Sequence, residues 1–338
     1  MSFRVILAGF GWWGQHLLPR LRNDLAFDVT AICAPELTED SLDGVPCFRD
    51  FDQAVRSCQA DAVILATPNH LHGPQLRAAA AAGLHVFCEK PLSLSADDAR
   101  GMAQAMASAG RVMGIGHERR FEPAMQQISQ WVGGGELGTI LHAEAAFSHD
   151  KLAGLGRDNW RTRASTAPAA GMTGMGIHLT DFMIWMFGPV RSVQALTASR
   201  VLGWETGDVV TVQLAFHAGM TATLSALLAT PHFIRFHVFG SQAWAETRSD
   251  SHPDTPGGQS HLTFQRSGAD AVSTSFAWQD SVVSNLAAFA DACRGGEEYP
   301  FTLEQLVHNI EVLEAISRSA ETGETVRLDP PRIYPGAE

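Results

Sequence analysis

The chain has 338 residues, of which 45% are hydrophobic and 18% charged, which is typical of a soluble globular protein long enough for two domains. Its net charge of −12 gives no basic surface for nucleic acid, and no apolar run reaches the length of about 18 residues that predicts a membrane span. Five cysteines without C-x-x-C spacing indicate reduced thiols in a cytoplasmic protein. A strand begins almost at once, which leaves no room for a signal peptide.

Short apolar runs alternate with helical segments over residues 1–120. Ser95, followed by acidic residues in the first turn, is a typical start of a helix. The predicted strands are 4–8, 29–33, 62–66, 85–88 and 111–116, and the predicted helices are 15–21, 51–58, 71–82 and 95–110. This alternation predicts an α/β domain with a doubly wound parallel sheet, a Rossmann fold.

Residues 121–338 have a different pattern, in which strands follow one another through short turns. The predicted strands are 140–147, 190–199, 208–216, 220–229, 233–239 and 243–247, and the predicted helices are 123–132, 171–187, 283–293 and 302–322. They indicate an α+β domain with a large, mostly antiparallel open sheet, and a mobile loop at 250–258. A sheet face without covering helices predicts a homodimer or homotetramer.

Gly9-Phe10-Gly11-Trp12-Trp13-Gly14 follows the first predicted strand directly and opens a helix. This G-x-G-x-x-G pattern, between a strand and a helix, is typical of dinucleotide binding. Gly9 permits the tight turn, Gly11 lets the backbone approach a pyrophosphate, and Gly14 lets the helix pack closely. The free N–H groups of the helix then hold the phosphates. We expect a dinucleotide cofactor rather than a glycine-rich turn without a ligand.

The end of the second strand bears on the choice between NAD and NADP. An NAD-binding fold usually has an acid there to hold the ribose 2′-hydroxyl. This chain has Ala34 at that position, with no adjacent Arg or Ser and with Glu36 two residues further on. Since the charge of Glu36 would repel a 2′-phosphate, the sequence favours NAD.

Three polar segments follow strands at the edge where a doubly wound sheet binds ligands. They are residues 67–72, 89–91 and 117–121. A lysine beside a cofactor can donate a proton or hydrogen-bond a substrate hydroxyl, which makes Lys90 a candidate. By position alone, Lys90 is equally well explained as a solvated lysine in a turn.

These motifs have the order and spacing of a known family. Residues 9–14, 61–72 and Glu89-Lys90-Pro91 make the chain resemble the Gfo/Idh/MocA oxidoreductases, the relatives of glucose–fructose oxidoreductase and inositol dehydrogenase. The resemblance runs nearly end to end, through residues 116–121, 135–138, 160–161, 176–181 and 314–323. Glu-Lys-Pro after the Rossmann strand predicted at residues 85–88 is its most specific part.

The resemblance implies an N-terminal NAD(P) domain and a C-terminal domain for substrate binding and subunit contact. It implies that Lys90 lies near the nicotinamide and substrate, that Lys90-Pro91 is a candidate cis peptide, and that His178 exchanges a proton with the reacting hydroxyl. Without it, His178 would more often be a packed or capping residue. The expected cofactor-binding residues are Gly9, Phe10, Gly11, Trp12, Trp13, Gly14, Ala34, Glu36, Thr67, Pro68, Asn69, His72, Glu89, Lys90, Pro91 and Glu118. The expected substrate-binding residues are Lys90, Arg120, Trp160, Arg161, Arg163, Thr173 and His178, with His149 nearby.

The surroundings of His178 depart from the family pattern. Many relatives have an aspartate four residues before the histidine, where this chain has Gly174, and Thr173 cannot replace a carboxylate. Asp181, three residues after His178, shares its helix face and is expected to be catalytic by orienting the imidazole. The helix dipole explains an acid in a first turn equally well. Arg161 and Arg163 are also open to a second interpretation, as structural pairs in a long loop.

The leading hypothesis is an enzyme, an NAD(P)-dependent dehydrogenase or reductase acting on a secondary alcohol or ketone of a sugar, inositol-like polyol or derivative. One alternative is glycoside cleavage through transient oxidation by tightly held NAD. Another is a non-catalytic regulator of the same fold, which need not keep Lys90 and His178. No metal site is expected, because His70 and His72 have no carboxylate partners nearby.

Overall fold

The computed structural model describes residues 2–330, and its internal contacts divide them into two units. Unit 1 contains residues 2–117 and 282–310, and unit 2 contains residues 118–281 and 311–330. The sequence predicts a single boundary after residue 120, whereas the segment 282–310 belongs with the N-terminal residues. Residues 331–338 of the predicted second domain lie outside the described part of the chain.

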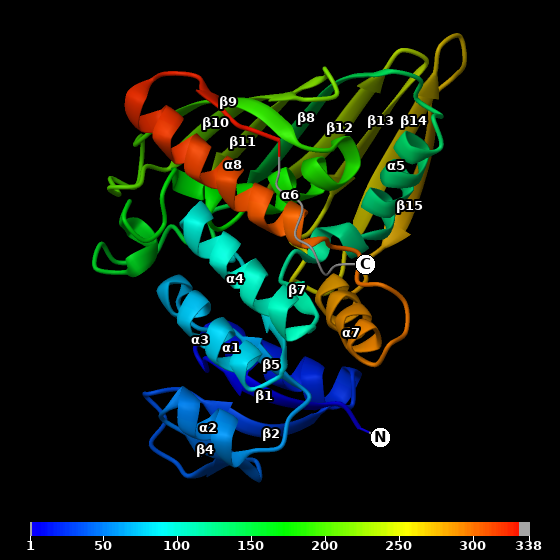
Figure 1. Ribbon diagram of the computed structural model, residues 1–338. Coiled ribbons are helices and arrows are strands. Elements are labelled where there is room, and N and C mark those ends of the chain that lie inside the picture. Colours follow the sequence, from blue (N-terminus) through cyan, green and yellow to red (C-terminus); the bar gives the residue numbers. More distant parts are fainter. Residues whose placement is uncertain (1, 331–338) are drawn as a thin grey trace. The chain divides into compact units, whose positions relative to one another are not determined.

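Unit 1 is built on a seven-stranded sheet in the order β3-β4-β2-β1-β5-β6-β7 (Figure 1). Its strands are β1 (Arg4–Ala8), β2 (Asp28–Cys33), β3 (Ser41–Leu42), β4 (Val45–Phe48), β5 (Ala62–Leu65), β6 (His85–Cys88) and β7 (Met113–Ile115). All neighbours pair in parallel except β3 with β4. This is the predicted α/β doubly wound sheet, extended by β3 and β4, which the sequence pattern did not indicate.

Helices connect these strands, and one of them, the helix after Ser95, has the cap that its sequence suggests. They are α1 (Trp12–Pro19), continued by a π-helical turn (Arg20–Asp24), α2 (Phe51–Ser57), α3 (Asn69–Ala81) and α4 (Ala96–Ala109). The side chain of Ser95 accepts a hydrogen bond from the backbone N–H of Asp98, and α4 ends at Gly110 with φ of 60°. Such caps satisfy backbone groups that have no partner inside the helix.

A late helix, α7 (Ser281–Cys293), completes the core of unit 1. The ring of Phe289 packs edge-on against Phe3 and Phe87, with ring centroids 6.3 Å and 5.5 Å away. Leu286 is also fully buried in this cluster. Burial of a side chain of this size stabilises the fold by about 2–3 kcal/mol, which explains why residues 282–310 belong to unit 1.

Unit 2 contains a nine-stranded sheet in the order β15-β14-β13-β12-β8-β11-β10-β9-β16. Its strands are β8 (Ile140–Ser148), β9 (Val190–Ala198), β10 (Val209–Phe216), β11 (Thr221–Leu227), β12 (Phe233–Gly240), β13 (Ala243–Ser249), β14 (Gln259–Arg266), β15 (Val272–Ala277) and β16 (Val326–Arg327). Every neighbouring pair is antiparallel except β8 with β11. The predicted large, mostly antiparallel sheet is confirmed, with β14 and β15 as an unpredicted hairpin.

The helices of unit 2 are η2 (Glu118–Phe121), α5 (Pro123–Gly133), η3 (Trp160–Thr162), η4 (Ala170–Met172), α6 (Gly176–Phe187) and the later part of α8 (Leu303–Thr322). Of these, α5, η4 and α6 pack against one face of the sheet, and α5 and α6 are labelled in Figure 1. Phe182 of α6 meets Phe236 of β12 edge-on at 5.0 Å. On the strands, buried residues alternate with more exposed ones, as in β10. No helix among residues 2–330 is both long and apolar enough to span a membrane.

The other face of the sheet is lined by polar and exposed apolar side chains. It carries Leu196 and Phe233, which are 66% and 37% exposed, and an ion pair between Arg235 and Glu144. A hollow of about 590 Å³ runs over β8 to β12 on this face.

Candidate active site

The glycine motif forms the turn between β1 and α1. Gly9 has φ of +92°, and a Cβ there would lie 2.4 Å from the backbone of Ala66. A Cβ on Gly14 would lie 2.1 Å from the carbonyl oxygen of Gly9, so both positions require glycine. A Cβ on Gly11 would meet nothing within 4 Å, and no side chain caps the start of α1. Open space beside uncapped N–H groups fits a pyrophosphate.

The two tryptophans of the motif have different surroundings. Trp13 packs against the core of unit 1, together with Phe10. Trp12 is 61% exposed and lies against Trp13 and His16, with ring centroids 5.6 Å and 4.3 Å away. Trp13 therefore serves packing, while Trp12 leaves most of its ring accessible.

The end of β2 has a neighbour that the sequence pattern did not indicate. Ala34 is buried, and its backbone N–H donates to the carbonyl of Phe48, at the end of β4. The sequence has no Arg or Ser adjacent to Ala34, but Arg49 follows Phe48 directly and so comes next to β4, the strand that pairs with β2. Its guanidinium donates to the Thr38 carbonyl at 2.8 Å and lies 3.5 Å from Asp40. Glu36 is exposed beside this end of the strand.

His72 supports the predicted cofactor loops from inside. Its two ring nitrogens lie 2.9 Å from the carbonyl oxygen of Thr67 and 3.0 Å from that of Pro91. The side chain is 1% exposed, and burial lowers its pKa. His72 therefore ties the loop after β5 to the loop after β6, and the expectation that it contacts the cofactor itself does not fit its burial.

The Glu89-Lys90-Pro91 turn contains the cis peptide that the family resemblance suggests. The Lys90-Pro91 peptide is cis. Glu89 is buried, which raises its pKa, and a Cβ on Gly116 would lie 2.4 Å from its carboxylate. Lys90 is partly exposed and lies directly after β6.

His178 lies in the first turn of α6, in unit 2. Its Nδ1 lies 3.5 Å from a carboxylate oxygen of Glu118, and the two side chains are 5% and 14% exposed. A carboxylate beside one imidazole nitrogen orients the ring. The sequence analysis expected Glu118 to bind the cofactor. In the structure its carboxylate lies beside the imidazole of His178.

The sequence suggested that Asp181 interacts with the His178 imidazole or with the helix dipole, but its carboxylate interacts with neither. It lies beyond the first turn of α6, so the helix dipole does not explain it. Its carboxylate accepts hydrogen bonds from Arg120, and both residues are buried. Two expectations are therefore wrong: Asp181 does not orient the imidazole directly, and Arg120 is not available to a substrate.

The remaining predicted substrate residues lie in the loop before α6. Arg161 stacks on the ring of Trp160 at 4.2 Å, and burial lowers its pKa. Arg163 is exposed. Thr173 is buried, and its hydroxyl donates to the carbonyl of Pro168 at 3.5 Å. Arg161 and Arg163 form no ion pair within residues 2–330, so the interpretation as structural pairs finds no support.

A cluster of three histidines, His149, His178 and His252, lies around Phe147 at the end of β8. The sequence analysis named His149 and His178 but not His252. The ring of Phe147 is 6.3 Å from His178, 5.8 Å from His149 and 5.3 Å from His252. Nδ1 of His252 lies 2.5 Å from the carboxylate of Asp254.

Asp254 also accepts a hydrogen bond from the ammonium of Lys151 at 2.7 Å. These contacts fasten part of the predicted mobile loop 250–258 to β8. His252 and Asp254 are two residues apart in a polar loop, and no periodicity signals their pairing. Within the part of the chain that the structure describes, no group of three acidic, histidine or cysteine side chains forms a metal site.

The comparisons with known proteins agree with this architecture. Residues 3–117 match the oxidoreductase family with an NAD-binding Rossmann fold, and residues 125–246 match the GFO/IDH/MocA C-terminal domain. The chain therefore belongs to the Gfo/Idh/MocA family and is an NAD(P)-binding oxidoreductase.

Similar proteins include sugar and inositol dehydrogenases. D-xylose 1-dehydrogenase (NADP(+)) 2 of Haloferax volcanii is 29% identical over 85% of this chain and 86% of its own. Inositol 2-dehydrogenase 4 of Saccharopolyspora erythraea is 26% identical over 87% and 86%. The structure of aldose-aldose oxidoreductase from Caulobacter crescentus superposes with a TM-score of 0.84, at 23% identity over 97% of this chain and all of that chain.

Proposed function

We propose that the protein is a dehydrogenase that oxidises a secondary alcohol of a sugar or inositol-like polyol, or reduces the corresponding ketone. The observation that carries this proposal is the buried His178 beside Glu118 at the head of α6. A buried imidazole held by a carboxylate suits a group that takes a proton from a hydroxyl.

Each of the proposed site residues has its own role in this reaction. Residues 9–14 would hold the pyrophosphate of the cofactor through backbone N–H groups, beside the open space at Gly11. The cofactor supplies a nicotinamide that accepts or returns a hydride. Lys90 hydrogen-bonds the reacting oxygen and stabilises its developing negative charge. His178 receives the proton of the hydroxyl and is held by Glu118.

NAD is the proposed cofactor. Glu36 is exposed beside the end of β2, where its charge disfavours a 2′-phosphate. The charge of Arg49 is partly compensated by Asp40. The D-xylose relative carries NADP(+) in its name. The proposed preference of this chain for NAD therefore rests on its own residues at the end of β2 and not on that relative.

A homodimer or homotetramer through the open sheet of unit 2 is part of the proposal. Leu196 and Phe233 are exposed on the face opposite α6, beside the hollow over β8 to β12. Apolar side chains on an open sheet face are typical of an interface.

The test is a panel of sugars and polyols that includes D-xylose and myo-inositol, scanned for NADH or NADPH formation by absorbance. A dehydrogenase gives one equivalent of reduced cofactor per turnover. Glycoside cleavage through transient oxidation would give hydrolysis without net NADH. Tight cofactor binding without any turnover would contradict the proposal and favour the regulator.

A further inference from the structure

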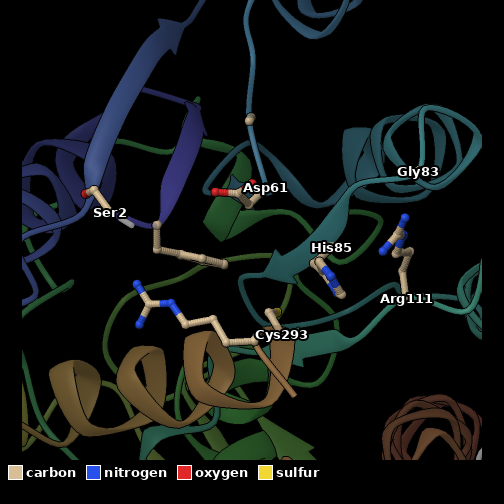
Figure 2. Close-up of a pocket in the computed structure, with 9 residues that line it drawn as sticks. Ser2, Asp61, Gly83, His85, Arg111 and Cys293 are labelled. Carbon is tan, nitrogen blue, oxygen red and sulfur yellow. The ribbon is translucent and has the colours of Figure 1, made fainter. Parts of the chain in front are cut away.

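Polar groups outside the proposed catalytic residues are arranged differently in the two units. Unit 1 has a hollow of about 450 Å³ where β5 and β6 begin, and Figure 2 shows Asp61 on one side of it, with His85 and Arg111 on another. The polar groups of this wall are therefore spread out. In unit 2, by contrast, the rings of His149 and His252 meet edge-on, with their centroids 5.1 Å apart.

His149 presents a hydrogen-bond donor from its ring. The residue follows β8 directly and is only 5% exposed. Its Nδ1 accepts a hydrogen bond from the backbone N–H of Lys151 at 3.3 Å. Burial lowers the pKa of His149 to about 4, so the ring is neutral near pH 7 and carries a single proton. Because Nδ1 is the acceptor, that proton is on Nε2.

His252, in the loop between β13 and β14, presents the opposite function. Its Nδ1 lies 2.5 Å from the carboxylate of Asp254. Burial opposes the ionisation of Asp254, but the contacts with His252 and Lys151 outweigh it and lower the pKa, so the carboxylate can only accept. It therefore selects the tautomer with the proton on Nδ1, although the backbone N–H of Asp254 also lies 3.3 Å from that atom. Burial, opposed by Asp254, lowers the pKa of His252, so the ring is neutral and its Nε2 is an acceptor.

Neither of these Nε2 atoms has a protein partner. Within residues 2–330, no hydrogen bond to Nε2 of His149 or of His252 forms, and neither atom is sealed from solvent. Polar atoms of nearly buried side chains are normally satisfied by protein, by water or by a ligand. A donor and an acceptor on two neighbouring rings thus remain available.

The two rings lie next to the proposed acid/base. Both contact the ring of Phe147, whose centroid is also 6.3 Å from that of His178. The loop that carries His252 is fastened at Pro253, whose carbonyl accepts a hydrogen bond from the indole N–H of Trp278 at 2.9 Å. The imidazoles therefore keep their positions before a ligand arrives.

We propose that His149 and His252 together bind one hydroxyl group of the substrate, which accepts a hydrogen bond from Nε2–H of His149 and donates one to Nε2 of His252. This role rests on the proposed function and concerns a hydroxyl other than the reacting one. A hydroxyl both donates and accepts, whereas a carbonyl or ionised phosphate oxygen only accepts and an ammonium group only donates. The pair therefore selects a polyhydroxylated substrate over forms that are deoxygenated or phosphorylated at that position.

Nitrogen-15 NMR of the imidazole rings near pH 7 tests the pair itself, with signals assigned through His149→Asn and His252→Phe. The two rings should be opposite tautomers, with the proton of His149 on Nε2 and that of His252 on Nδ1. Asp254→Asn removes the carboxylate and should release the His252 ring to a mixture of both tautomers. The same tautomer in both rings, or a charged His252, would overturn the pair.

Steady-state kinetics test the role of the pair in binding. The probes are D-xylose, myo-inositol and the other members of the sugar and polyol panel, with the monodeoxy analogues of whichever is oxidised. His252→Phe keeps a ring against Phe147 and should raise KM about tenfold or more with kcat little changed, because it removes a hydrogen bond present before and during the reaction. One monodeoxy analogue should show the same rise in the parent protein and no further rise in His252→Phe, because both changes remove the same contact.

His232→Phe is the matched control and should leave KM unchanged, since Nε2 of His232 already lies 3.2 Å from the carbonyl oxygen of Ser249. Urea denaturation shows whether each variant is folded. Where His252→Phe is not, Asp254→Asn, which keeps the ring, should raise KM in its place.

The outcomes separate this role from the proposed function. Turnover by the parent protein with the same KM in His252→Phe, or equal KM for every deoxy analogue, would leave the proposed function intact and assign the pair to a bound water instead. No turnover of any panel member would contradict the proposed function, and the substrate role with it, even where the tautomers are opposite.

Discussion

Asp181 accepts two hydrogen bonds from Arg120, 2.9 Å from Nε and 2.7 Å from Nη2, and the two side chains are only 2% and 1% exposed. The pair joins η2 to α6, the two elements that carry Glu118 and His178. A bidentate, charge-assisted contact fixes direction as well as distance. Asp181 is therefore a positioning residue, which acts on the imidazole through the elements that hold it.

Asp181→Asn should lower the free energy of unfolding by about 3 kcal/mol, because the buried charge of Arg120 loses the Asp181 carboxylate. Urea denaturation measures this change. The double variant Arg120→Met/Asp181→Leu removes both charges and should recover most of the loss. A variant that keeps full stability but loses turnover would instead mean that Asp181 acts on the proton transfer itself.

Lys90→Ala and His178→Ala should each reduce turnover on an identified substrate by a factor on the order of 10² or more. Cofactor affinity should change little. His178→Ala should also flatten the rise of rate with pH through neutrality, because the titrating base is gone. His217→Ala, an exposed histidine, serves as the control. Near-normal turnover in both variants would show that the catalytic assignment is wrong.

The histidine cluster at the end of β8 makes stability depend on pH. Burial, helped by His252 and Lys151, lowers the pKa of His149 to about 4, although Asp254 opposes the change. The unfolded chain titrates near 6.5, so between these values it binds a proton that the folded chain does not. This contribution is fully present above pH 6.5 and is lost as the pH falls towards 4.

His149→Asn removes that titration. The free energy of unfolding of the parent protein should fall by roughly 2–3 kcal/mol more than that of the variant between pH 7 and pH 4.5. Urea unfolding at both values gives the difference. Parallel losses in the two proteins would mean that His149 is not the titrating group. His232 also lies near His149, so His232→Asn is the neighbouring control.

NAD should bind about tenfold more tightly than NADP, because the Glu36 carboxylate repels the 2′-phosphate that only NADP carries. Equilibrium titration with the two cofactors measures the preference. Glu36→Gln should narrow the gap, since it removes the repelling charge. Arg49→Gln should leave NAD affinity unchanged. If the protein prefers NADP and the preference disappears in Arg49→Gln, then Arg49 and not Glu36 determines the cofactor specificity.

Light scattering at micromolar concentration should show a dimer or tetramer. Leu196→Asp places a charge on the open face of the sheet and should shift the protein towards monomer. Val201→Asp, at a residue 72% exposed in the loop after β9, is the control and should not. A monomeric parent protein would rule out the proposed assembly.

Local patterns predicted the elements of the fold well, because alternating apolar runs and glycine or serine caps depend on neighbours in sequence. The strands β14 and β15 escaped prediction, since their polar and exposed residues lack the period of a half-buried strand. The spacing of the motifs, through the family resemblance, predicted Lys90 and His178 as catalytic residues. It could not give Glu118 as the partner of His178 or Arg120 as the partner of Asp181, because those pairs form only when η2 meets α6. The position of Arg49 next to the end of β2 was also not predicted, because Arg49 follows β4, a strand that the sequence pattern did not indicate.

The return of residues 282–310 to unit 1 determines how this protein can be recombined with its relatives. A fragment ending at residue 120 would lose Phe289 and Leu286, and the surfaces of Phe3 and Phe87 would face solvent. A chimera that exchanges unit 2 should therefore take residues 118–281 as an insert and keep both flanking segments from the same parent. In that sense the oxidoreductase is a Rossmann domain interrupted by the family's C-terminal domain, and α8 continues from the residues of one unit into those of the other near Ile310.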